Sequence, residues 1–303
     1  MTLTMRLQAL WTGHYRRAIS VALLLLLASG SALAGVAEVR KQVEASMLVT
    51  GMVFIAPDGS VHQLDVDNAD KLPPGVRNLI DTASQAWRFE PHVVDGVAKL
   101  AKARMSLRVV AKQLEGGDYS LQLRSAYFGK EALTPEELIA REGTATVRAG
   151  SLKPPMYPEG AAIAGASGVA YLIVKIGKDG RVADAIVEQV NLQVLGNERV
   201  MDDLRKAFGK SALRATKSWT FQVPTTGASA NDPYWSVRVP VSYMMPGKKE
   251  PGYGEWSVYV PGPKEKAAWA GDDTGMGDAD AMIAGGVYLI GDGVRLLTPL
   301  QSS

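Results

Sequence analysis

The chain has 303 residues, 47% of them hydrophobic and 21% charged, which suits a globular protein with room for two domains of ordinary size. It contains no cysteine, which excludes disulfides, thiolate nucleophiles and zinc–thiolate sites. The formal net charge of +2 falls close to zero without the first 34 residues, because three arginines precede the first acidic residue, Glu38. A near-neutral chain offers no field for phosphate backbones, so we expect no nucleic-acid partner.

Residues 1–34 have the pattern of a secretory signal peptide. A basic, acid-free start is followed by an apolar run from Ala18 to Ala28 and then by Ala32-Leu33-Ala34, an A-x-A cleavage pattern. The run is shorter than the roughly 20 residues that span a bilayer. We therefore expect cleavage before Gly35 and a periplasmic protein. The alternative is a protein anchored in the inner membrane by its uncleaved signal.

Residues 35–130 are predicted to form a first β-β-α-β module. Asp58-Gly59 between two apolar runs indicates a β-hairpin, because glycine tolerates the positive φ of such turns. Pro73-Pro74 then begins a helix whose apolar side chains follow helical spacing: Val76, Leu79, Ile80, Ala83 and Trp87. In the last strand Met105, Leu107 and Val109 alternate with Ser106 and Arg108.

Residues 131–150 are expected to form a linker that contains a short helix. Thr134-Pro135-Glu136-Glu137 is a capping box with proline at the first helical position, and Gly143 can end the helix.

Residues 151–245 repeat the first layout as a second module. Asp179-Gly180 predicts the hairpin, Val200, Leu204, Ala207 and Phe208 predict the helix, and the alternating residues 235–243 predict the last strand. Each copy has a W-x-F motif after its helix, which we interpret as a core plug: Trp87 and Phe89, then Trp219 and Phe221. The second copy has a longer interval between its turn and its tryptophan, which predicts a longer helix or longer loops.

Pro240 lies inside the last predicted strand and cannot donate a hydrogen bond to a neighbouring strand, which predicts that this strand is an exposed sheet edge. Such an edge can pair with an incoming extended peptide. Alternatively, the proline protects the edge against pairing. The Gly/Pro-rich tail, residues 246–303, is expected to be partly disordered or loosely docked, with short strands near 256–260 and 287–290. A tail strand that covered the edge would favour a scaffold over a binding module.

Five motifs in order carry a family resemblance: Tyr157-Pro158-Glu159-Gly160-Ala161, Gly168-Val169, Asp179-Gly180-Arg181-Val182, Trp219-Thr220-Phe221 and Val239-Pro240-Val241-Ser242-Tyr243. Residues 153–245 thereby resemble the C-terminal domain of the TonB energy-transducer family. The first copy, residues 44–111, shares the D-G-x-V and W-x-F pieces but lacks the Y-P segment. Unlike TonB itself, the chain has no proline-rich spacer after its predicted signal.

The resemblance implies an α+β fold of two β-β-α-β modules, each a small antiparallel sheet covered by one helix. It also implies a non-enzymatic protein-binding module of the periplasm, connected with TonB-dependent outer-membrane transport. Its partners would be envelope proteins or extended peptides that bind by strand addition, and the implied contact residues are Tyr157, Pro158, Val237, Val239 and Val241. The alternative function is an envelope scaffold, or a homodimer, that uses the same sheet edges.

Catalysis finds little support in the sequence. After the predicted signal the chain has only two histidines, His62 and His92, and it contains no H-E-x-x-H or G-x-S-x-G motif. We therefore predict a protein that is not an enzyme and that has no metal site and no cofactor.

Overall fold

The computed structural model describes residues 44–114, 118–129, 144–245, 247–248, 251–271 and 277–301. These residues form a mixed α+β fold with three α-helices, and every strand pairing among them is antiparallel. The predicted signal peptide and the predicted linker helix at 134–143 lie outside the described residues. Within the described part of the chain, no helix is both long enough and apolar enough to cross a membrane.

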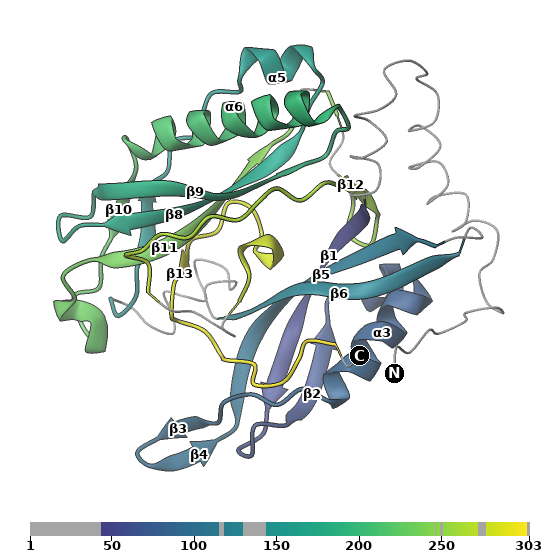
Figure 1. The fold of residues 1–303 in the computed structure, drawn as a ribbon. Helices are drawn as coiled ribbons and strands as arrows, with labels where there is room; N and C mark the ends of the chain where they lie inside the picture. The colour runs from purple at the N-terminus through teal and green to yellow at the C-terminus, as the bar shows by residue number, and fades with distance from the viewer. Residues whose placement is uncertain are drawn as a thin grey trace.

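The first sheet follows the order β12-β1-β5-β6, with β2 paired to the far half of β1 (Figure 1). Its strands are β1 (Glu44–Ile55), β2 (Val61–Val66), β5 (Ala101–Gln113), β6 (Tyr119–Gly129) and β12 (Ser257–Tyr259). Helix α3 (Pro74–Gln85) follows a one-turn 3-10 helix, η1 (Ala69–Lys71), and packs on one face of this sheet. The predicted apolar stripe is confirmed at Val76, Ile80 and Ala83, which are buried, and Leu79 is partly buried against the same core. Trp87 is buried too, but it lies beyond the end of α3.

The second sheet follows the order β13-β11-β8-β9. Its strands are β8 (Gly168–Ile176), β9 (Val182–Leu192), β11 (Trp235–Tyr243) and β13 (Tyr288–Leu289). Helix α6 (Glu198–Thr216) packs on one face and is 19 residues long, against 12 in α3, which accounts for part of the longer interval in this half. The predicted stripe is wrong at Val200, which is exposed, because Met201 takes the buried position.

The two hairpins and their W-x-F motifs are built in the same way. Gly59 and Gly180 both have positive φ, and their carbonyls accept the backbone N–H groups of Phe89 and Phe221, each at 2.7 Å. The aromatic residues are buried in both halves, which confirms the predicted core plugs: Trp87, Phe89, Trp219 and Phe221.

Several short elements complete the fold. They are α5 (Glu159–Ile163), the 3-10 helices η2 (Ala228–Asn231) and η3 (Ala279–Ala281), the paired strands β7 (Arg148–Ser151) and β10 (Thr220–Gln222), and the hairpin β3 (His92–Val94) and β4 (Val97–Lys99). The β3–β4 hairpin projects from the first sheet (Figure 1). Residues 148–150, which were expected in the linker, belong to β7.

The tail differs from the loosely docked segment that its composition predicts. It pairs with β1 through β12, bonds with Leu192 of β9 through Val260, bonds with β6 through Asp278, and pairs with β11 through β13. The short helix η3 lies between the two sheets, on the faces opposite α3 and α6 (Figure 1). The order of layers is therefore helix, sheet, tail, sheet and helix.

Candidate functional site: the outer edge of strand β11

Strand β11 lies between β8 and the tail, and Pro240 is placed where its missing N–H costs no bond to β8. In an antiparallel strand the N–H and C=O of one residue point to the same side. The Pro240 carbonyl accepts from the Gly285 N–H at 3.0 Å, so the backbone of this residue points away from β8. The Ser236 carbonyl, four residues earlier, likewise accepts from Ile290 at 2.8 Å. The outward positions of β11 are thus Ser236, Arg238, Pro240 and Ser242.

The expected exposed edge is wrong over the first part of β11. Tyr288 and Leu289 of β13 pair antiparallel with Arg238 and Val237, and the flanking bonds extend this cover from Ser236 to Pro240. The predicted strand at 287–290 therefore exists, and it fills the edge that Pro240 indicated. The cover ends at Pro240, and the side chain of Ser242 is exposed.

The five residues predicted to contact a partner lie at the second sheet. The side chains of Val237, Val239 and Val241 are buried in the core that the sheet shares with α6, and their backbone groups point toward β8, so neither is presented at the outer edge. Tyr157 is half-buried, its ring meets Tyr243 at the end of β11 edge-on at 6.0 Å, and its hydroxyl donates to the Ala166 carbonyl. Pro158 is the N-cap residue of α5.

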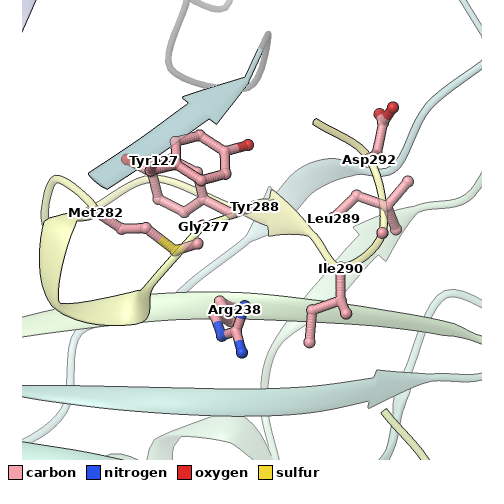
Figure 2. Close-up of a pocket in the computed structure, with 9 residues that line it drawn as sticks. Tyr127, Arg238, Gly277, Met282, Tyr288, Leu289, Ile290 and Asp292 are labelled. Carbon is pink, nitrogen blue, oxygen red and sulfur yellow. The ribbon is translucent and has the colours of Figure 1, made fainter. Parts of the chain in front are cut away.

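A small pocket lies where β6, β11 and the tail meet (Figure 2). Tyr127 of β6 and Tyr288 of β13 contact each other edge-on, with ring centroids 5.0 Å apart. The Tyr288 hydroxyl donates to the Ile283 carbonyl at 2.9 Å and accepts from the Ile283 N–H at 3.0 Å. The Tyr288 side chain therefore closes a turn within the tail and packs it against β6.

A buried ion pair lies beneath this pocket. The guanidinium of Arg238 donates twice to the Glu188 carboxylate, from Nε at 2.7 Å and from Nη2 at 2.8 Å. Both residues are buried, and two parallel bonds of this kind are among the strongest polar contacts in proteins. The pair fixes β11 to β9 across the intervening β8.

An open groove continues from the start of the covered edge. Tyr234 and Trp269 line it, and the Tyr234 hydroxyl donates to the Trp269 carbonyl at 3.0 Å. The Lys175 ammonium lies 4.1 Å from the ring centroid of Tyr234 and 5.9 Å from that of Trp269, which places a cation over both rings.

A buried polar cluster around Asp280 joins the tail to both sheets. The Asp280 carboxylate accepts from Asn191 of β9 at 2.7 Å and from Tyr259 of β12 at 2.5 Å. Its backbone carbonyl accepts from Arg108 of β5 at 2.9 and 3.1 Å. Burial, and then the adjacent Asp280 charge, raise the pKa of Tyr259, and burial raises the pKa of Tyr171 in the same cluster.

Sequence reasoning missed this cluster. Ser106 and Arg108 were identified only as the second face of an alternating strand, and that face is buried because η3 packs on it. The available signal was the tail itself, where apolar segments near 256–260 and 287–290 interrupt the Gly/Pro-rich composition. Among the described residues no three His, Asp or Glu side chains are grouped as metal ligands, and the side chains of His62 and His92 are exposed.

The chain matches no protein-family model, no curated protein and no solved structure.

Proposed function

We propose that this chain is a non-enzymatic protein-binding module of the periplasm, built from two copies of a fold that resembles the C-terminal domain of TonB. The observation that carries the proposal is the pairing of β13 with β11. An extended segment from a distant part of the chain is added there as an antiparallel edge strand, which is the geometry of peptide recognition by strand addition.

The repeated contacts support two copies of one module. In the hairpins, Ile55 pairs with Val61 and Ile176 with Val182, each next to a register shift at the same place. The turn glycine then bonds to the phenylalanine of W-x-F in each copy. The two helices differ in length and sequence, yet both lie between the same hairpin and the same W-x-F contact. This favours duplication of one module over a chance similarity.

The third strands of the two copies support a binding edge. Strand β5 holds β6 on its outer side over ten paired positions, from Arg104 to Gln113. Strand β11 holds β13 on the corresponding side over only two. The same edge accepts a full strand in one copy and is mostly free of regular pairing in the other.

A closed envelope scaffold is the second candidate. The tail strand that covers the first part of the β11 edge favours it, and so do the remaining tail contacts. The tail also pairs with β1 through β12, and residues 260–265 bond with the outer edge of β9 at Leu192 and Glu188. In that case the protein would be a rigid structural component of the envelope or would form homodimers.

The test uses Ser242, whose N–H points away from β8. Ser242→Pro removes that donor and leaves the bonds between β11 and β8 intact, and Ser242→Ala is the matched control. We expect wild type and Ser242→Ala to capture the same envelope proteins after cross-linking in periplasmic extract, and Ser242→Pro to lose them. Equal capture by all three would exclude edge pairing, and recovery of the protein alone as a dimer would favour the closed scaffold.

A further inference from the structure

The tail segment on β11 is a template for what this edge accepts. Its N–H groups at Gly285 and Ile290 reach the outward carbonyls of Pro240 and Ser236. These donors are five residues apart on the tail and their acceptors four apart on β11, so the tail holds one extra residue near Gly285-Gly286. Pro240 offers a carbonyl and no N–H, so a bound segment must supply a donor there and needs no acceptor.

Glycine at 286 is required by the aromatic residue that follows. A Cβ on Gly286 would lie 2.6 Å from ring atoms of Tyr288, well inside van der Waals contact. The ring of Tyr288 is buried against Tyr127 and Met282 (Figure 2). Leu289 then packs against the core of the second sheet. The occupant thus combines a glycine, an aromatic residue two positions later and an aliphatic residue after that.

The tail holds this edge with few contacts. Regular pairing covers two residues of β13, whereas β6 has ten paired positions on the equivalent edge of β5. Gly285 and Gly291 flank the segment with positive φ, so it turns away on both sides. A short segment that is joined to a sheet by few backbone hydrogen bonds can open locally in a native protein.

We infer that the outer edge of β11 is a binding site for extended segments of the form Gly-x-aromatic-aliphatic, and that residues 285–290 are its resident occupant. The inference rests on the proposed function and adds the chemistry of the partner. A partner segment competes with the tail for Ser236, Pro240 and the pocket beside Tyr127. Its apparent affinity is reduced by the fraction of molecules in which the tail occupies the edge.

The experiment uses the full chain and a fluorescein-labelled peptide with the sequence of residues 283–292. Gly286→Val expels the tail without changing β11, and Ala284→Val, at an exposed neighbouring position, is its control. We expect anisotropy titrations to show at least about tenfold tighter peptide binding by Gly286→Val than by wild type or Ala284→Val. A peptide with alanine in place of Tyr288 should not bind. Equal binding by Gly286→Val and wild type would overturn the inference.

A disulfide provides a second test that does not depend on the stability of Gly286→Val. Val237 and Leu289 face each other as a non-hydrogen-bonded pair, because Val237 bonds toward β8, and such pairs bring their Cβ atoms close. The chain has no cysteine of its own, so Val237→Cys with Leu289→Cys forms one defined bridge. The bridged protein should not bind the peptide, and reduction should restore binding. Unchanged binding by the bridged form would contradict the inference.

The same variants separate this inference from the proposed function. If Gly286→Val binds the peptide but no periplasmic protein competes for it, the edge has the stated chemistry and the proposed protein-binding function fails. If periplasmic proteins are captured equally by bridged and reduced protein, the protein-binding function uses another surface and this inference fails.

Discussion

At the scale of single residues, Gly59 occupies a position that no other residue can fill. Its φ is +83°, and a Cβ there would lie 2.2 Å from the carbonyl oxygen of Phe89. Gly96, in the β3–β4 turn, has a similar φ of +78° but nothing within 4 Å of the same point. Substitution of Gly96 therefore tests backbone strain alone, whereas substitution of Gly59 adds steric overlap with Phe89.

We predict that Gly96→Ala costs about 1–2 kcal/mol of unfolding free energy, the cost of the left-handed conformation. Gly59→Ala should cost clearly more, because the backbone of the W-x-F motif must also shift. Urea unfolding of both variants measures this difference. Equal costs would mean that the hairpin and the motif are less tightly joined than their 2.7 Å bond indicates.

The buried hydroxyl of Tyr243 should make the folded state less stable at alkaline pH. Burial raises the pKa of its hydroxyl from 10.0 to about 12, and this hydroxyl donates to the Phe208 carbonyl at 3.0 Å. Because the folded state holds the proton more tightly than the unfolded state, this contribution is complete below pH 10 and is lost as the pH rises toward about 12. Urea unfolding between pH 9 and about 12 should therefore show a smaller alkaline loss for Tyr243→Phe than for wild type. Parallel curves would contradict the prediction.

At the scale of elements, the end of the tail completes the first half of the molecule. In the second half, Phe221 pairs with Ala149, and the indole N–H of Trp219 donates to Lys153, four residues further on. In the first half, Phe89 bridges to Leu296, and the indole N–H of Trp87 donates to Leu300, again four residues further on. The tail thus supplies the first half with a counterpart of β7, the strand that precedes Tyr157-Pro158 in the second half.

Removal of residues 294–303 should therefore weaken the first half selectively. The lost partners include the bonds from Leu297 to Arg88 and from Val294 to Phe128. We predict faster amide hydrogen exchange in β1 and α3 and little change in β8 and α6, measured by mass spectrometry. Deletion of only 302–303 is the control. Uniform faster exchange in both halves would show that the tail stabilises the molecule as a whole and completes neither half in particular.

At the scale of the whole molecule, Asp280 connects the two sheets through the tail. Asp280→Ala would remove the carboxylate that lies 3.6 Å from Arg108 Nε, while the bonds from Arg108 to the backbone carbonyl of residue 280 remain. Loss of one charge from a buried pair leaves the other charge uncompensated and costs about 3–5 kcal/mol. Asp278→Asn is the matched control, because its ion pair with Lys264 is largely exposed and is worth at most about 1 kcal/mol.

Urea unfolding should show this contrast. In addition, Asp280→Ala should make the tail more sensitive to trypsin at Lys264 and Lys266 under native conditions. Equal cleavage of both variants would mean that other tail contacts hold the segment in place and that Asp280 serves only the packing between the sheets.

The helices, strands and turns could be predicted from the sequence, because their causes are local. The turn glycines, the helical stripes at α3 and α6 and the alternation in β5 and β11 each depend on residues within a few positions of one another. The sequence also identified Pro240 as an edge residue, because a missing N–H is a property of the residue itself. The strand near residues 287–290 could be predicted as well, because it is a short apolar segment within a Gly/Pro-rich tail.

Which strand edges meet could be seen only in the folded chain. A strand pattern gives the face that is buried but not the distant segment that pairs with it, so the contacts of Leu289 with Val237 and of Leu296 with Phe89 could not be predicted. The burial of Arg108 has the same origin. In the sequence pattern Arg108 lies on the polar face of its strand. That face is buried because the tail places the backbone of Asp280, 172 residues further along the chain, against it. These contacts depend on the path of the whole chain, and that path places the tail on the edge of β11.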